Sequence, residues 1–190
     1  MIHLDPLQWQ FEQLKLKFGP DLEKEFINLL NFKAGEKRME TTPYQVAKNF
    51  IGLKEIPGIV NNPLIVAMHQ IDNPAIEDES VPWCSSFVNF IFFCLGLIRT
   101  KSARARSWLQ IGEEITLDDA DHGFDVVILK RGKGNQPGPE TINAPGHVGF
   151  YVRHDDKNVW LLGGNQGDQV SIAQFPVTSI LGIRRVKREA

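Results

Sequence analysis

The spacing of apolar residues changes from a helical period in the first half of the chain to short strand-like runs in the second. Residues 5–33 predict two amphipathic helices. Thr42-Pro43 and Asn62-Pro63 each supply a cap and a first-turn proline for a further helix, the first ending near residue 57 and the second near residue 71. Beyond residue 112, runs rich in Val, Ile, Phe, Tyr and Leu alternate with Gly, Pro, Asn and Asp, which is typical of antiparallel strands. The predicted strands are 124–130, 147–154, 158–163, 170–175 and 181–187.

The strongest apolar run lies between these halves, in residues 82–98, with the sequence PWCSSFVNFIFFCLGLI. Pro82 suits a helix start, and from Phe87 onward almost no polar residue interrupts the run before Gly96. A helix that is apolar most of the way round belongs in the centre of a domain. The pattern therefore predicts a buried helix that begins close to Cys84.

Helices followed by a meandering sheet predict an α+β fold, in which the central helix packs on an antiparallel sheet of about five strands. The charged stretch 33–40 is the one candidate boundary. We therefore expect an N-terminal helical extension over residues 1–40 and a single further domain over residues 41–190.

The charge balance gives no support for a nucleic-acid or membrane-surface protein, since the formal net charge is −2. No stretch approaches the roughly 20 apolar residues of a transmembrane helix, and the first residues lack the features of a secretory signal. We expect synthesis in the cytoplasm and no membrane insertion. A basic cluster follows the central helix and is expected to be solvated or to meet substrate carboxylates; its members are Arg99, Lys101, Arg104 and Arg106.

The chain has two cysteines, Cys84 and Cys94. On one helix they are separated by about 15 Å of rise, against the roughly 4.4–6.8 Å between Cα atoms that a disulfide needs. No disulfide is expected between them. The scattered histidines and cysteines match no close metal-ligand spacing, so neither a metal nor another cofactor is predicted.

Cys84 is the best candidate for chemistry, because a thiol at a helix N-terminus tends to ionise. His147, at the start of a predicted strand, is the candidate base. Asn165 and Gln166 follow a glycine pair, and either amide oxygen would orient the imidazole; Asn165 is favoured. The backbone N–H of Cys84, with Ser85 beside it, is the candidate oxyanion donor.

Two aromatic residues are candidates for the walls of a substrate cleft. Tyr151 lies on the predicted strand that starts at His147. Trp83 fits either a core or a cleft, and its place beside Cys84 favours the cleft.

Four segments occur in an order that resembles the NlpC and CHAP groups of papain-like cysteine hydrolases: PWCSSFVNF, SARARSWLQIG, GHVGFYV and LLGGNQGDQVSI. The resemblance covers residues 44–186. It implies a papain-like core, with Cys84 as nucleophile, His147 as base and Asn165 as the orienting residue. Many NlpC-type enzymes have an acidic residue where this chain has Trp83.

The same resemblance implies a cell-wall hydrolase that cleaves an amide bond of the peptidoglycan peptide. An endopeptidase is favoured over an N-acetylmuramoyl-alanine amidase. Delivery by a phage lysis system or by an injecting secretion machine would bring it to the periplasmic cell wall, with a delivery or immunity protein as a possible partner. The alternatives are a non-catalytic binding protein on this fold and a papain-like hydrolase or acyltransferase acting on protein or lipid.

Overall fold

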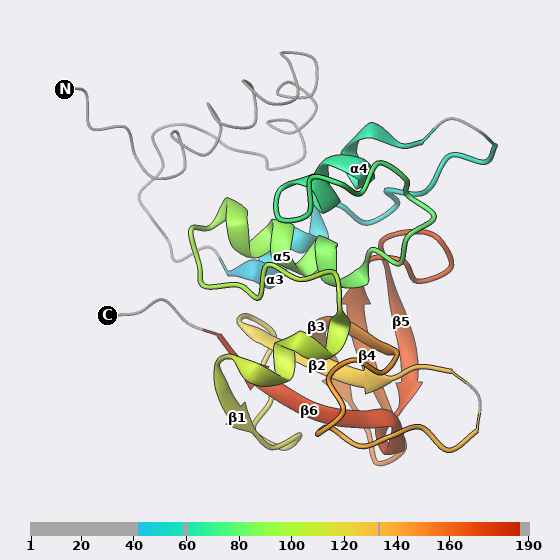
Figure 1. The fold of residues 1–190 in the computed structure, drawn as a ribbon. Coiled ribbons are helices and arrows are strands. Elements are labelled where there is room, and N and C mark those ends of the chain that lie inside the picture. The colour runs from blue at the N-terminus through green and yellow to red at the C-terminus, as the bar shows by residue number, and fades with distance from the viewer. Residues whose placement is uncertain (1–41, 59–60, 133, 187–190) are drawn as a thin grey trace, which may run out of the picture.

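The computed structural model describes residues 42–58, 61–132 and 134–186, which form helices packed on a six-stranded antiparallel sheet (Figure 1). The strand order is β1-β6-β2-β3-β4-β5. The α+β class is confirmed, whereas the predicted helical extension over residues 1–40 lies outside the described residues.

The helices are α3 (Pro43–Lys48), α4 (Pro63–Gln70) and α5 (Cys84–Cys94), with 3-10 helices η1 (Ala105–Gln110) and η2 (Val177–Ser179). The strands are β1 (Glu113–Ile115), β2 (Asp125–Lys130), β3 (Gly146–His154), β4 (Asn158–Gly163), β5 (Ser171–Pro176) and β6 (Ile180–Arg185).

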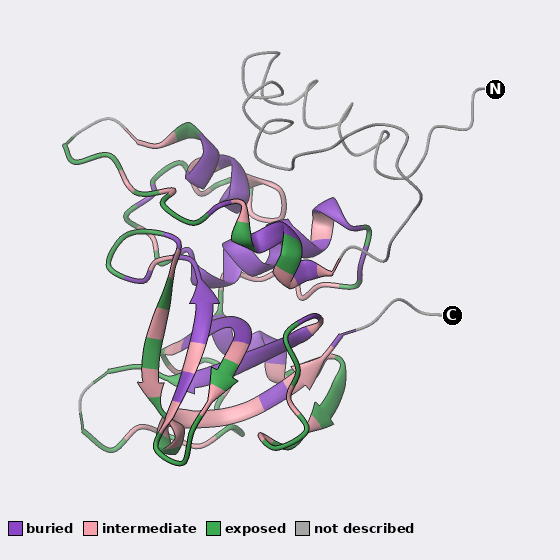
Figure 2. Cartoon of the chain, turned by 180° about the vertical axis from the view of Figure 1, so that it is seen from behind, coloured by how far each residue is buried: buried purple, intermediate pink, exposed green. Residues whose placement is uncertain are grey.

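Helix α5 is the centre of the core, as its apolar sequence predicts. Every residue of the helix except Phe93 is buried, and the helix is correspondingly coloured as buried in Figure 2. Phe87 and Phe92 both contact Phe150 of β3, with ring centroids 6.2 Å and 6.1 Å apart. These aromatic contacts hold the helix against the middle of the sheet.

Alternate residues of β3 face two different apolar clusters. Val148 and Phe150 belong to the cluster around α5. Tyr151 points to the opposite face and joins a second cluster with Val127 and Leu161. Both faces of the central strands are therefore covered, which agrees with the nearly continuous apolar sequence of β2.

Two elements differ from the prediction. Helix α3 starts as predicted, with a capping box between Thr42 and Gln45, but it ends at Lys48. The chain then turns at Gly52, whose φ is +93° and whose N–H donates to the carbonyl oxygen of Val170 at 2.9 Å. Ile51, just before this turn, is 49% exposed. Strand β1 was not predicted because it has only three residues, two of them glutamates, and is formed by pairing with β6.

A buried ion pair links β2 to β6. Asp125 is 1% exposed and faces Arg185 directly across the two strands. The guanidinium donates from Nε and Nη2 to the two carboxylate oxygens at 2.7 Å and 2.6 Å. A bidentate pair of this kind fixes register as well as adding energy.

We expect Asp125→Ala to lower the free energy of unfolding by about 2–3 kcal/mol, less than a fully buried pair would lose, because solvent reaches Arg185. Glu114→Ala is the matched control. It removes an exposed ion pair with Arg184 between the neighbouring strands, and it should cost less than about 1 kcal/mol. Chemical denaturation measures the free energy of unfolding of both variants. Equal losses would contradict a larger contribution from the Asp125–Arg185 pair.

Candidate active site

Three side chains from separate elements meet at one end of the sheet. Cys84 is the first residue of α5, and His147 is the second residue of β3. Gln166 lies in the turn between β4 and β5. All three are buried, with exposures of 2%, 5% and 9%. The structure thus brings the predicted cysteine and histidine together at a helix start and a strand start.

The amide of Gln166 is fixed in one orientation. Its Nε2 donates to the carbonyl oxygens of Leu161 and Ser171, at 3.3 Å and 2.5 Å. The amide oxygen is left to face Nε2 of His147, at 3.0 Å. Because this oxygen only accepts, it selects the imidazole tautomer that carries a proton on Nε2. Nδ1 is then the nitrogen available to exchange a proton with the cysteine.

The preference for Asn165 over Gln166 as the partner of His147 was wrong. Asn165 has a left-handed backbone, with φ of +56°, and its side-chain amide donates to Oε1 of Glu55 at 3.1 Å. The turn therefore directs Asn165 away from the imidazole and directs the next residue toward it. A sequence places both amides after the glycine pair but does not specify this backbone conformation.

The pKa of the Cys84 thiol is lowered although the sulfur is buried. Burial raises the pKa, but the hydrogen bond and the charge of His147 outweigh it, together with the backbone N–H of Val148 and the charge of Arg131. At Cys94 burial outweighs a backbone hydrogen bond and the charge of Arg99, and it raises the pKa far above the ordinary value. Both cysteines are free. The two thiols of α5 therefore differ in chemistry rather than in exposure.

The start of α5 offers backbone donors next to the sulfur. The first helical hydrogen bond runs from the N–H of Phe87 to the carbonyl of Trp83, and no side chain caps the helix. The N–H groups of the first turn, including that of Cys84, thus have no partner within the helix. Backbone donors at a helix start are of the kind that can stabilise negative charge developing on a carbonyl group attacked by a neighbouring nucleophile.

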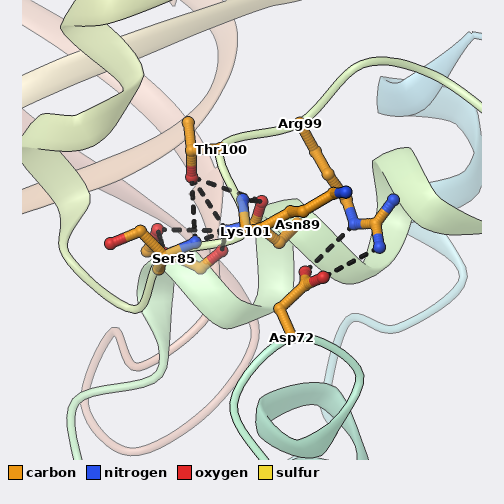
Figure 3. A network of polar contacts seen from close by, with 7 residues as sticks. Asp72, Ser85, Asn89, Arg99, Thr100 and Lys101 are labelled. Carbon is orange, nitrogen blue, oxygen red and sulfur yellow. Dashed lines mark hydrogen bonds and ion pairs between the residues drawn. The ribbon is translucent and has the colours of Figure 1, made fainter.

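The side chain of Ser85 does not take part in this arrangement, contrary to the expectation that it lies beside the oxyanion. Its hydroxyl donates to the carbonyl of Ser102 at 2.7 Å and accepts from the indole of Trp108 at 3.1 Å. Figure 3 shows Ser85 in a buried network with Asn89 and Thr100. Ser85 therefore anchors the helix start to the segment that follows the helix.

Neither aromatic candidate lies in a cleft. Trp83 is fully buried, and its ring packs so closely on Gly164 that an added Cβ there would come within 2.5 Å of it. Tyr151 lies four residues beyond His147 on β3, about 13 Å along the strand. Its hydroxyl contacts Nδ1 of His154 at 2.7 Å. Both predictions were wrong, because large aromatic side chains near a site are also the ones that best fill the core.

Only part of the predicted basic cluster is solvated: Lys101 and Arg104 are exposed, whereas Arg99 and Arg106 are engaged within the fold. Arg106 is fully buried and donates from Nε to the carbonyl oxygen of Pro145 at 2.9 Å. Its Nη1 donates to three further carbonyl oxygens of the same loop, including that of Gly138 at 2.6 Å. Arg99 forms a bidentate pair with Asp72, also visible in Figure 3. Arg106 therefore fixes the loop that leads into His147, a role that its sequence context did not indicate.

Among the described residues, no three His, Cys, Asp or Glu side chains form a group that could hold a metal ion. None of the helices within that part of the chain is long and apolar enough to cross a bilayer.

Comparison with solved structures finds similar folds among NlpC proteins. NlpC1 and NlpC2 from Trichomonas vaginalis each superpose with a TM-score of 0.46, at 17% and 14% identity over 81% and 83% of this chain. An NlpC/P60 family protein from Bacillus cereus ATCC 10987 superposes with a TM-score of 0.44, at 16% identity over 79% of this chain. The chain resembles NlpC/P60 structures. It spans 47%, 51% and 41% of their lengths, respectively.

A comparison with protein-family models finds no match, and neither does a comparison with curated proteins.

We expect a small alkylating reagent to label Cys84 at a lower pH than Cys94. An ordinary thiol has a pKa of about 8.5. The lowered pKa of Cys84 lets its thiolate form at a lower pH than that, whereas the raised pKa of Cys94 keeps its thiol protonated there. The single-cysteine variants Cys94→Ala and Cys84→Ala separate the two profiles. The two residues are similarly buried, at 2% and 4% exposed. Coincident pH midpoints would contradict the conclusion that Cys84 ionises more readily than Cys94.

Proposed function

We propose that the protein is a cysteine hydrolase that cleaves an amide bond in the peptide of bacterial peptidoglycan. Cys84 is the nucleophile, His147 the general base and acid, and Gln166 the residue that orients the imidazole. The observation that carries this proposal is the meeting of an ionisable thiol, an imidazole and a fixed amide oxygen at the start of α5.

In the first step, the Cys84 thiolate attacks the carbonyl carbon of the scissile amide. A carbon–sulfur bond forms and the carbonyl electron pair moves to oxygen, where the backbone N–H of Cys84 stabilises the oxyanion. The carbon–nitrogen bond then breaks while His147 gives its Nδ1 proton to the departing amine. The product of this step is an acyl-enzyme with a thioester at Cys84.

In the second step, His147 takes a proton from water, and the resulting hydroxide attacks the thioester carbon. The carbon–oxygen bond forms, the carbon–sulfur bond breaks, and the thiolate returns to its hydrogen bonds with His147 and Val148. The hydrogen bond from Nε2 to Gln166 keeps the ring in place through both proton transfers.

The choice of a cell-wall peptide rests on the four sequence segments that resemble NlpC and CHAP hydrolases. We favour an endopeptidase over an amidase. The acidic residue of many NlpC-type enzymes is replaced by Trp83, which is buried, so this position makes no substrate contact of that kind. Delivery to the periplasm and a delivery or immunity partner stay predictions.

Purified peptidoglycan digested with the protein should release new ends that mass spectrometry assigns to one amide bond. Cys84→Ala and Cys84→Ser should lower the rate by at least about a thousandfold, because the thiolate is lost. Cys94→Ala is the control and should keep the activity, since Cys94 lies outside the site. Equal products from the wild-type protein and Cys84→Ala, or none from either, would contradict the proposal.

Gln166→Ala should slow peptide release by about a hundredfold, because the imidazole loses the acceptor that selects its tautomer. Gln169→Ala removes an exposed glutamine from the same turn and should leave the rate unchanged. If both variants behave alike in the peptide-release assay, Gln166 has no orienting role.

A further inference from the structure

One carboxylate oxygen connects the two segments that carry the site. Oε1 of Glu55 accepts from the indole N–H of Trp83 at 2.7 Å and from the side-chain amide of Asn165 at 3.1 Å. Trp83 is the residue before Cys84, and Asn165 is the residue before Gln166. The two groups that Glu55 holds are thus each one peptide unit away from a proposed site residue.

Glu55 is itself held in place by the backbone. Its N–H donates to the carbonyl oxygen of Asp168 at 2.9 Å, and the neighbouring Lys54 forms a β-bridge with Gln169. The N–H of Val170 donates to the carbonyl of Leu53 at 2.7 Å. The segment that bears Glu55 therefore runs alongside the turn that contains Gln166.

The glycine pair that precedes Asn165 is closely packed. The Trp83 ring packs on Gly164, and an added Cβ at Gly163 would lie 3.1 Å from the amide oxygen of Gln166. A displacement of the turn relative to the start of α5 is therefore transmitted to the His147–Gln166 contact. Asn165 has a positive φ, a conformation that non-glycine residues rarely adopt and that its hydrogen bond to Glu55 helps to hold.

We propose that Glu55 is a positioning residue. Its carboxylate links Trp83 to Asn165, an arrangement called the clamp below, and so holds Cys84 and Gln166 in position beside His147. This inference rests on the proposed function for its catalytic consequence, although the clamp itself is a structural feature. It also accounts for a tryptophan before the cysteine: the indole combines an apolar ring for the core with the N–H that Glu55 requires.

The test measures the pH midpoint of Cys84 alkylation and the rate of peptide release, both in Cys94→Ala protein. Glu55→Ala should raise the midpoint by about 0.5–1 pH unit, because a displaced imidazole lowers the thiol pKa less, and it should slow peptide release by about tenfold. Glu55→Gln keeps an oxygen that can accept from Trp83 and Asn165. Its alkylation midpoint and rate of peptide release should stay close to those of the Cys94→Ala parent protein. Asp118→Ala, which removes a carboxylate that is 97% exposed, should change neither.

Two narrower variants keep the test valid if Glu55→Ala fails to fold. Trp83→Phe keeps an aromatic ring in the core but removes the indole N–H together with part of the ring volume, whereas Asn165→Gly permits the left-handed backbone and removes the side-chain amide. Each should raise the alkylation midpoint by part of the Glu55→Ala shift. Unchanged midpoints and rates in all three variants, with an active parent protein, would overturn the clamp and leave the proposed function standing. Shifted midpoints with no peptide release by the parent protein would support the clamp and reject the substrate.

Discussion

The hydrogen bond between the Cys84 thiol and the His147 imidazole is the interaction on which this account depends. Burial alone would keep the thiol protonated, as it does for Cys94 on the same helix. The main groups that reverse this effect at Cys84, the His147 side chain and the Val148 N–H, both belong to β3, and the charge of Arg131 adds to them. The chemistry of the cysteine is therefore set by how α5 packs on β3, through the contacts of Phe87 and Phe92 with Phe150.

The helix start is fixed by polar groups that lie inside the core. Ser86 contacts Nδ1 of His69 at 2.8 Å, and His69 is fully buried, with its pKa lowered mainly by burial. Asn89 donates to the carbonyl groups of Ser85 and Ser102, each at 3.0 Å. Buried polar groups with satisfied hydrogen bonds specify one arrangement more sharply than apolar packing does. They anchor the start of α5, which has no side-chain cap of its own.

The sequence was sufficient to predict most of the elements but not the contacts between them. Helix α5, the hairpin from β3 to β4 and the cysteine–histidine pair follow from local patterns of apolar residues, turn residues and residue type. The contact of His147 with Gln166, rather than with Asn165, depends instead on the left-handed backbone of Asn165. Asparagine tolerates this conformation but does not require it. The roles of Glu55 and Arg106 depend on partners far along the chain, at Asn165 and Pro145, and no periodicity within either segment marks them.

Ultraviolet absorbance of the thiolate, followed across a pH titration of the folded protein, tests the central claim most directly. We predict one thiolate that forms below the ordinary pH range of cysteine in the wild-type protein, that persists in Cys94→Ala and that is lost in Cys84→Ala. A signal that appears only at alkaline pH, or one that remains in Cys84→Ala, would contradict the assignment of Cys84 as an ionised nucleophile.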